Sequence, residues 1–478
     1  MTAALRFPPT PSQATAIKAL AMLVSTEKRK PTLVIEGFAG SGKTSLMKAF
    51  CDTADDMGVG VVLLAPTGRA AKILASYTGR NAFTIHRIIY RQVDASQDAP
   101  FSRSFNRWKR AIFIIDEASM VGDSYDAQDN GRATAWGEGR LLTDVVDFVF
   151  SQEGSKLVLI GDPDQLPPVG CDSSPALNVD YLRSLGLTVG RVKLTDVVRQ
   201  QSGSMILTNA MALRGIVDSE TTDTYVPTLL VKSGSDVETS SGETLLEQIE
   251  ASYSRYGLQD AVIITRSNKR ATQYNIALRS QVLGYDDLLV KGDLLIVNKN
   301  NYLWSERAGC DFIANGDIAE VVSIRERSEM HGLHFADVSL RLIDRNGIDI
   351  DCKILLDMLT ADVDVSDEDT RQLKCTSTSD IYNMLSKGSE ADYGHYTNQR
   401  KKALDIRKDP WLNALQVRFA YALTCHKAQG GQWGSVFLDP GYIPPESSTV
   451  GLSRWLYTAI SRARRHLYLI NYPAVESL

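Results

Sequence analysis

The chain has 478 residues, of which 44% are hydrophobic and 23% are charged, and its formal net charge is −5. These proportions exclude disordered, collagen-like and coiled-coil chains, and the length predicts about three domains. Apolar runs such as residues 61–65 are far shorter than the roughly 20 residues of a membrane-spanning helix, and the N-terminus shows no secretory signal. We therefore expect a protein of the cytoplasm without a membrane segment. The six cysteines form no CxxC pair, which predicts reduced thiols.

The first third of the chain alternates short apolar runs with helical patterns. Such runs, rich in branched residues and separated by helices, predict buried strands of a parallel sheet. A second set of apolar runs near the C-terminus predicts a second α/β domain. The predicted strands are 32–36, 61–65, 111–115 and 156–160 in the first set, and 261–265, 417–422, 435–438 and 466–470 in the second.

Between the two parts of the second set, residues 286–411 change to short alternating segments with turn residues. The pair Asn346-Gly347 is a strong hairpin signal, and this texture predicts a small inserted β-barrel. Residues 361–402 are polar and acid-rich, and they are either an excursion with some helix or a mobile surface arm. Residues 123–140 are rich in Asp and Gly and predict an exposed loop before a helix at 141–150.

The segment GFAGSGKT follows the first predicted strand and precedes the helical pattern SLMKAF. In this strand-loop-helix context, glycines let backbone N–H groups converge on phosphate oxygens at a helix N-terminus. Lys43 supplies a cation for the outer phosphates, and the Thr44 hydroxyl is suited to Mg²⁺. A chance glycine-rich turn is the alternative, and the strand and helix on either side disfavour it. The predicted phosphate-binding residues are Gly40, Ser41, Gly42, Lys43 and Thr44.

Two acids, Asp116 and Glu117, follow the predicted strand 111–115 at the edge where parallel sheets bind ligands. We expect Asp116 to join a Mg²⁺ shell and Glu117 to orient and deprotonate an attacking water. A solvated pair of strand-end acids is the alternative.

Three further residues are candidates for contact with the γ-phosphate. Gln165 follows the predicted strand 156–160, although its proline-containing segment also fits a simple turn. Arg199 and Arg462 are candidates for arginine fingers that stabilise transition-state charge. The alternative for each arginine is a solvated surface position.

Eight segments follow one another along the chain: GFAGSGKT, APTGRAAKIL, TIHRIIY, IFIIDEASM, GDPDQLPPV, LTDVVRQ, YALTCHKAQGGQW and YTAISRARRHL. With these segments in this order, the chain resembles the superfamily 1 DNA helicases of the RecD/Dda group, and the phage Dda type in particular. The resemblance covers the whole chain, weakly only over 123–140 and 361–402. It implies two RecA-like domains with ATP and Mg²⁺ in their cleft, single-stranded DNA across their top, and translocation from 5′ to 3′. It also implies an SH3-like barrel, a β-hairpin pin that separates strands, and a bacterial or phage-infected bacterial cell.

The resemblance also assigns roles to residues of this sequence. Gln13 matches the adenine-reading glutamine, and Gln165, Arg199 and Arg462 match the γ-phosphate sensors. Hydroxyl, amide, imidazole and ammonium groups at strand ends suit phosphates, as sequence-independent strand binding requires; for His426 a core position is the alternative. The residues that match DNA-contacting positions are Pro66, Thr67, His86, Asn268, Thr424, His426 and Lys427.

The insertion at 87–110 combines basic residues with aromatic ones and fits the position of the family's pin. We expect Phe101 to be the wedge that stacks on a base at the fork, an interaction worth about 1–3 kcal/mol per base. An aromatic patch that only seats the hairpin is the alternative, and it is our interpretation of Trp108.

The expected domains are 1–190 for the first RecA-like domain, 191–285 with 412–478 for the second, and 286–411 for the SH3-like insertion. The expected function is an ATP-dependent 5′ to 3′ DNA helicase of replication, repair or recombination. Its expected partners are single-stranded DNA, forked or tailed duplex DNA, and single-strand-binding or replication proteins. One rival is an ATP-switched nucleic-acid-binding protein without processive unwinding, which has no use for an aromatic wedge. A small-molecule kinase or GTPase is a second rival, and it leaves both arginines and the second α/β domain unexplained.

Overall fold

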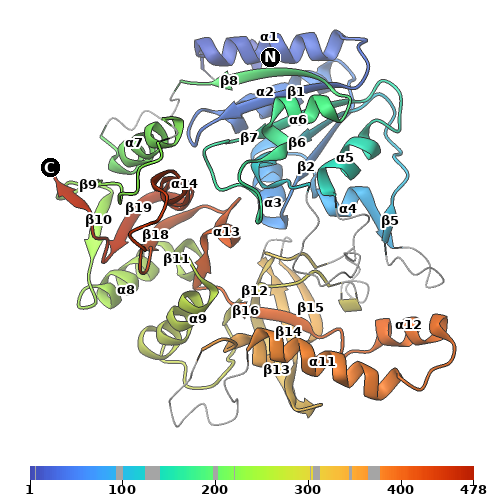
Figure 1. The fold of residues 1–478 in the computed structure, drawn as a ribbon, viewed down its shortest axis with the longest axis vertical. Helices are drawn as coiled ribbons and strands as arrows, with labels where there is room; N and C mark the ends of the chain where they lie inside the picture. The colour runs from blue at the N-terminus through green and yellow to red at the C-terminus, as the bar shows by residue number, and fades with distance from the viewer. Residues whose placement is uncertain are drawn as a thin grey trace. The chain divides into compact units, whose positions relative to one another are not determined.

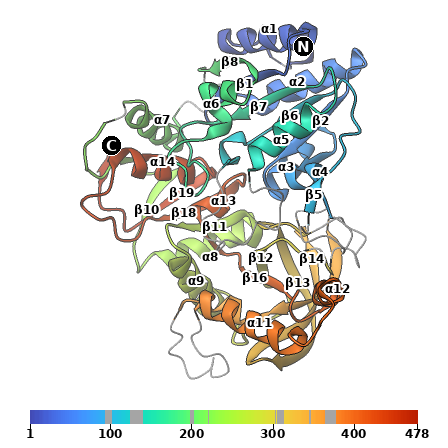
Figure 2. The same cartoon turned by 45° about the vertical axis from the view of Figure 1, so that its right-hand side comes forward.

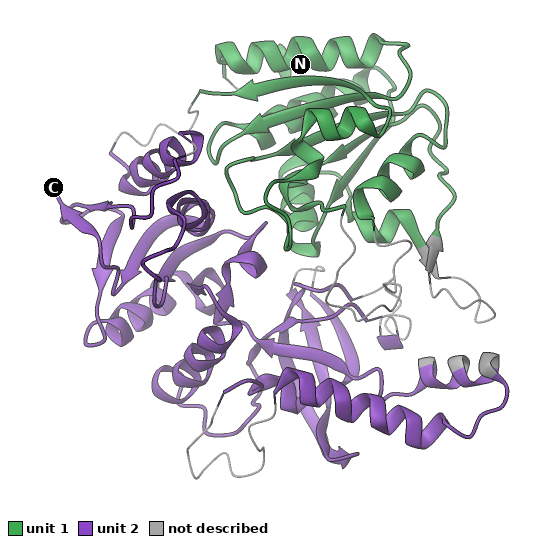
Figure 3. Ribbon diagram, in the orientation of Figure 1, with its two compact units in different colours: residues 1–202 green, residues 203–478 purple. Residues whose placement is uncertain are grey.

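A computed structural model describes residues 1–5, 7–92, 101–123, 140–196, 203–219, 221–301, 303–304, 313–343, 347–363 and 377–478. The chain divides into two compact units, residues 1–202 and 203–478 (Figure 3). The predicted domain boundary at 190/191 falls inside a strand of the first unit, Thr188–Leu194. Among the described residues, none of the helices combines the length and apolar character needed to span a membrane.

Unit 1 contains a six-stranded sheet in which every neighbouring pair of strands is parallel. Side chains alternate between the two faces of β6, so that Phe113 and Ile115 join one apolar cluster and Ile112 and Ile114 join the other. Both faces are therefore buried, which explains the uninterrupted apolar runs of the sequence. In spatial order the strands are β3 (Ala82–Thr84), β2 (Val61–Ala65), β6 (Ile112–Ile115), β7 (Lys156–Gly161), β1 (Pro31–Gly37) and β8 (Thr188–Leu194).

The helices of unit 1 lie on the faces of this sheet (Figure 1). The predicted strands 32–36, 61–65, 111–115 and 156–160 are confirmed as β1, β2, β6 and β7, and the predicted helix at 141–150 is confirmed as α5. The sequence reading did not include β3, which has only three residues, or β8, whose outer position leaves most of its side chains at least partly exposed. The helices are α1 (Pro11–Ser25), α2 (Lys43–Asp56), α3 (Gly68–Thr78), α4 (Ile85–Ile89), α5 (Leu141–Val149) and α6 (Val179–Ser184).

A small antiparallel hairpin, β4 (Tyr90–Gln92) with β5 (Phe101–Arg103), confirms the predicted hairpin within 87–110. It is fastened to α5, because the Tyr90 hydroxyl donates to Asp144 Oδ2 at 2.7 Å. Behind it, Trp108 packs edge-on against Phe113 and Phe148, with ring centroids 6.1 and 6.5 Å apart. Trp108 thus packs against the apolar cluster that also contains Tyr90 of β4, and its role in seating the hairpin stays a prediction.

Unit 2 contains a five-stranded sheet that is also parallel throughout. In spatial order its strands are β10 (Val237–Ser240), β19 (Ala463–Ile470), β18 (Trp433–Asp439), β11 (Ala261–Thr265) and β17 (Ala422–Thr424). Its helices are α7 (Met205–Asp218), α8 (Leu245–Tyr256), α9 (Asn268–Ala277), α13 (Cys425–Ala428) and α14 (Thr449–Ile460). A short parallel pair, β9 (Leu229–Val231) with β20 (Val475–Ser477), completes this part.

The predicted inserted barrel is confirmed as a closed barrel of five strands. Its strands are β12 (Leu294–Val297), β13 (Ile318–Met330), β14 (Leu333–Leu342), β15 (Ile348–Leu355) and β16 (Leu415–Phe419). The described part of the predicted polar arm is helical, with α11 (Thr378–Tyr393) followed by α12 (Gln399–Lys408). Figure 2 shows α11 beside the barrel, and its buried Ile381 joins an apolar cluster with the barrel residues Leu333 and Phe335.

The prediction of one strand over 417–422 is wrong. The run contains the end of β16, which belongs to the barrel, and the start of β17, which belongs to the sheet. Between them Tyr421 is buried, and its hydroxyl donates to Asp293 Oδ1 at 2.9 Å and accepts from the backbone N–H of Leu294 at 3.1 Å. Because the whole run is buried, its hydrophobicity does not reveal the change of sheet.

Candidate nucleotide and nucleic-acid sites

The glycine-rich loop lies between β1 and α2. Gly40 and Gly42 have φ angles of 92° and 83°, in a region that L-residues with a Cβ rarely adopt. The Ser41 backbone N–H and hydroxyl both donate to the Phe38 carbonyl, at 3.1 and 2.9 Å. Lys43 Nζ donates to the carbonyls of Gly37 and Phe38, the latter at 3.0 Å. The loop therefore surrounds the lysine ammonium at the start of α2, the arrangement that phosphate oxygens require.

Gln13 lies in the first turn of α1 and is fully buried. Its Oε1 accepts from the Thr10 backbone N–H at 3.1 Å, and the Thr10 hydroxyl accepts from the Gln13 backbone N–H at 3.3 Å. These two bonds form a capping box at the helix start. Gln13 Nε2 also donates to the Ser41 carbonyl at 3.5 Å, so the predicted adenine-reading side chain is tied directly to the phosphate-binding loop.

The two predicted catalytic acids follow β6. Glu117 has φ 51°, a left-handed conformation that is uncommon outside glycine, and its backbone N–H donates to Asp116 Oδ1 at 3.0 Å. Burial and the neighbouring Glu117 charge raise the pKa of Asp116 to about 6, while the Lys43 ammonium acts in the opposite direction. The charges of Glu117 and Lys43 thus both act on Asp116, and a divalent cation at this position would relieve the repulsion between the two acids.

Gln165 follows β7 and is almost fully buried. Its Nε2 donates to Asp162 Oδ2 at 3.5 Å, but its buried Oε1 has no hydrogen-bond partner among the residues that the structure describes. A buried amide oxygen without a partner is unfavourable by about 1–3 kcal/mol. Because β1, β6 and β7 are parallel neighbours, this amide lies at the same sheet edge as the phosphate-binding loop and the two acids. The residues present therefore fit a bound nucleoside triphosphate with a divalent cation.

The two predicted arginine fingers differ in what the structure describes. Arg199 lies outside the described residues. Arg462 follows α14 and is only 3% exposed. Its guanidinium donates to the carbonyls of Thr458 and Gly431 at 3.0 and 3.3 Å, and to the Ser461 hydroxyl at 2.9 Å. Arg462 is therefore a buried, fixed guanidinium of unit 2 rather than a solvated surface arginine.

The predicted DNA-contacting residues of unit 1 follow β2 and β3 at the carboxyl edge of the sheet. Pro66 and Thr67 come directly after β2, and the Thr67 hydroxyl accepts from the Ala70 backbone N–H at 3.2 Å as the N-cap of α3. His86 lies in α4, and burial lowers its pKa to about 4. The imidazole is therefore neutral at physiological pH and is suited to hydrogen bonding rather than to ion pairing.

The predicted contacts of unit 2 lie at the carboxyl edge of the second sheet. The register pairs Thr265 of β11 with Thr424 of β17, so Asn268 and His426, which follow these strands and are both exposed, share one edge. Lys427 Nζ donates to Asn298 Oδ1, at the end of β12 in the barrel. Burial, with a smaller contribution from the charge of Arg418, lowers the pKa of Lys427 to about 8.

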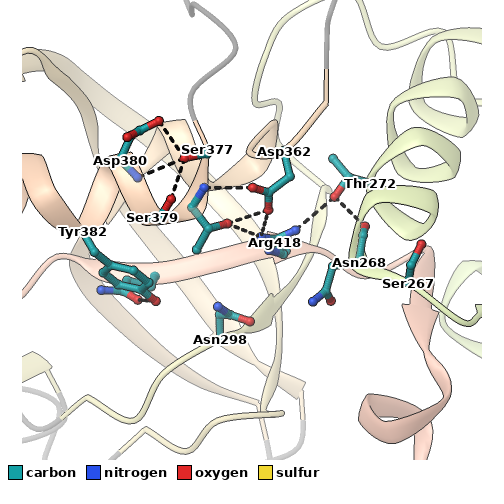
Figure 4. A network of polar contacts seen from close by, with 12 residues as sticks. Ser267, Asn268, Thr272, Asn298, Asp362, Ser377, Ser379, Asp380, Tyr382 and Arg418 are labelled. Atoms are coloured by element: carbon teal, nitrogen blue, oxygen red, sulfur yellow. Dashed lines mark hydrogen bonds and ion pairs between the residues drawn. The ribbon is translucent and has the colours of Figure 1, made fainter. Parts of the chain in front are cut away.

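The sequence analysis missed the network around Arg418 (Figure 4). Arg418 lies in β16 and is 7% exposed. Its guanidinium donates to Thr272 of α9 at 3.1 Å, to Asp362 Oδ2 at 3.1 Å, and to the Thr378 hydroxyl at the start of α11 at 2.9 Å. One side chain thus joins the barrel, the arm and the helix that begins at Asn268. The only signal in the sequence was a charged residue inside an apolar run.

The aromatic side chains of the predicted pin are described only in part. Phe101 belongs to β5, and its side chain lies outside the described residues. Phe105 is 69% exposed just after β5. Arg103 donates to Asp147 Oδ2 at 2.5 Å and lies 3.8 Å from Asp144, so two acids of α5 balance the charge of this arginine of the predicted pin.

Two family models match the chain. An AAA domain matches residues 9–135, which include the phosphate-binding loop and both acids. A UvrD-like helicase C-terminal domain matches residues 419–470, which include α13, β18, α14 and all of β19. The two matches fall in different units of the structure.

Individual relatives extend these matches. The chain is 32% identical over 187 residues to the ATP-dependent RecD2 DNA helicase of Deinococcus radiodurans, which covers 38% of the chain and 21% of that protein. It is 22% identical over 479 residues to the ATP-dependent DNA helicase dda of Enterobacteria phage T4, which covers 94% of the chain and 96% of that protein. A crystal structure of Pif1 helicase from Candida albicans matches with 16% identity and a TM-score of 0.47, covering 98% and 95% of the two chains.

Two of the relatives, RecD2 and a conjugal transfer protein, are much longer than this chain. The matched region spans 21% of RecD2 and 14% of the conjugal transfer protein TraA of Rhizobium radiobacter. The match to the phage T4 protein, in contrast, runs over nearly all of both chains.

Proposed function

Because the chain belongs to the RecD/Dda group of superfamily 1 helicases, we propose that it is an ATP-dependent DNA helicase that moves 5′ to 3′ along single-stranded DNA and unwinds duplex DNA. The observation that carries this proposal is the placement of two different sets of residues at carboxyl sheet edges. A phosphate-binding loop occupies one edge together with two acids and the buried Oε1 of Gln165, and the exposed polar residues Asn268 and His426 occupy the other.

Hydrolysis of ATP is assigned to unit 1. Mg²⁺, when bound, neutralises charge on the transferred phosphates, and Thr44 and Asp116 are the residues that would hold it. Glu117 remains beside that position as the acceptor of the proton of the attacking water. Its left-handed backbone turns the chain sharply after β6. Gln165 supplies the amide that senses the γ-phosphate.

Grip on the DNA strand is assigned to Pro66, Thr67 and His86 in unit 1 and to the edge residues of unit 2. The hydroxyl, amide, imidazole and ammonium groups of this set are suited to bind the sugar-phosphate backbone, and such contacts carry no base preference. The partners that this predicts are single-stranded DNA and forked or tailed duplex DNA. The polarity of 5′ to 3′ and the strand-separating role of the β4–β5 hairpin follow from family membership.

One assay separates this function from its rival, an ATP-driven switch without unwinding. ATP hydrolysis should be measured with and without oligo-dT, followed by unwinding of duplexes with a 5′ or a 3′ single-stranded tail, with Lys43→Ala as the inactive control. Stimulated hydrolysis with unwinding of the 5′-tailed duplex alone is expected. Stimulated hydrolysis without unwinding of either duplex would favour the switch. A hydrolysis rate that oligo-dT does not change would refute both the helicase and the switch.

A further inference from the structure

An exposed tyrosine lies beside the predicted DNA-contacting edge of unit 2. Tyr442 follows the end of β18 by three residues and is 80% exposed, the highest value for any large hydrophobic side chain in the described part of the chain. Single exposed aromatic residues are common on proteins and by themselves need no explanation. The case for a function of Tyr442 therefore depends on what surrounds it.

The position of Tyr442 is set by the sheet register and by two bonds to one carboxylate. Thr265 of β11 pairs with Thr424 of β17 on one side and with Asp439 of β18 on the other, so the segments after these three strands leave the sheet at one level. Asp439 Oδ1 accepts from the Gly441 backbone N–H at 2.8 Å, and Asp439 Oδ2 accepts from Arg270 Nε at 2.7 Å. The loop of Tyr442 is thus attached to the first turn of α9.

The chain on either side limits the freedom of this loop. Pro444 and Pro445 restrict the backbone just after Tyr442. At the far end of the loop, the Thr449 hydroxyl donates to the Tyr225 carbonyl at 2.9 Å. The ring is therefore presented to solvent by a segment that is anchored at both ends.

Three cationic residues lie within two positions of Asn268 in the sequence. Arg266 and Lys269 are exposed, and Arg270 is the partner of Asp439. Single-stranded nucleic acids are typically bound where cationic side chains follow the backbone and an aromatic ring accepts a base. This edge of unit 2 provides both kinds of side chain, and the amide of Asn268 lies between Arg266 and Lys269 in the sequence.

We propose that Tyr442 is a base-stacking residue for single-stranded DNA, with Arg266 and Lys269 contacting the adjacent phosphates. This inference rests on the proposed function. It adds a contact to the face of a base, whereas the contacts predicted from the sequence are to the sugar-phosphate backbone. Every base has a π-face, so such a contact strengthens binding without sequence preference.

The test compares two DNA probes of equal length, oligo-dT and an abasic phosphodeoxyribose oligomer, by fluorescence anisotropy. Tyr442→Ala should weaken oligo-dT binding by about 5- to 20-fold, in the lower part of the range for one base stacked on an aromatic ring. Tyr442→Phe keeps the ring and should bind like the wild type. The matched control is Tyr77→Ala, which removes a 52%-exposed tyrosine near the C-terminal end of α3.

The abasic probe decides the mechanism. If Tyr442 stacks on a base, Tyr442→Ala and the wild-type protein bind the abasic oligomer equally. Equal weakening on both probes, or no weakening on oligo-dT, would overturn the stacking role while leaving the helicase proposal intact. A wild-type protein that fails to bind oligo-dT would instead overturn the proposed function itself. Melting curves of the variants confirm that each is folded, as the exposure of Tyr442 leads us to expect.

Discussion

Lys427 offers a direct test of the predicted DNA contacts, because its charge depends on pH in an accessible range. Burial and the charge of Arg418 lower its pKa to about 8. The ammonium therefore loses its proton as the pH rises through about 8, whereas an ordinary lysine remains charged to about pH 10. The positive charge available to a phosphate is present at pH 7 and largely absent at pH 9.

The size of the effect follows from the fraction of protein that carries the proton. With a pKa of about 8, roughly nine-tenths of the molecules are protonated at pH 7 and roughly one-tenth at pH 9. If only the protonated form binds well, DNA binding takes up a proton above pH 8, and the affinity at pH 9 is at most about tenfold lower than at pH 7. Loss of one phosphate contact also lowers the salt dependence of log K by about 0.7 for a single strand.

The assay is the affinity for oligo-dT at pH 7, 8 and 9 with constant ionic strength. Lys427→Arg keeps its charge throughout this range and serves as the control, since it retains the pH response of every other group. We expect the wild-type affinity to fall more steeply than that of Lys427→Arg. Parallel pH profiles, or a salt slope unchanged in Lys427→Ala, would refute the phosphate contact and leave Lys427 as a partner of Asn298 only.

Three further predictions concern catalysis and strand separation. Glu117→Gln should retain ATP binding and block turnover, because it removes the proton acceptor alone; an equal loss of ATP affinity in a binding titration would reassign Glu117 to nucleotide binding. Arg462→Lys should lower kcat by about 10³-fold or more with little change in ATP affinity, and a melting curve checks its buried position; wild-type turnover would make Arg462 structural. The double variant Phe101→Ala with Phe105→Ala should slow unwinding strongly while DNA-stimulated ATP hydrolysis stays near normal, and a parallel loss of both activities would make these aromatics structural.

The apolar pattern predicted the central strands of both sheets because those strands are buried on both faces. It failed where a strand is short, as in β3, or partly exposed, as in β8. It also merged β16 with β17, because hydrophobicity reports burial and does not report which sheet a residue joins. Fold class was therefore predictable from the sequence, whereas the exact division between barrel and sheet required the strand pairing.

In the candidate sites too, the sequence predicts residues that are close together along the chain and misses contacts between distant ones. The glycine-rich loop and the acid pair lie within a few residues of their strands, so motif and secondary structure predict them together. The contacts of Arg418 with Asp362 and of Lys427 with Asn298 join residues 56 and 129 positions apart. No local pattern specifies such pairs, and only the folded barrel brings them together.

Several motif residues also have a local structural role. Gln13 completes the capping box of α1, Thr67 caps α3, and Ser267 caps α9 directly before Asn268. Each of these residues lies where a connecting segment ends and a helix begins. Its side chain bonds to the backbone at the helix start, so it is oriented before any ligand binds. Such caps hold the neighbouring contact residues at the sheet edge before the ligand arrives. Binding then does not have to order a long loop, a step that would lose conformational entropy and weaken binding. Each of these motifs therefore has two parts. One residue starts the helix, and its neighbours are left to contact the ligand, which is why a motif predicts both a helix start and a site.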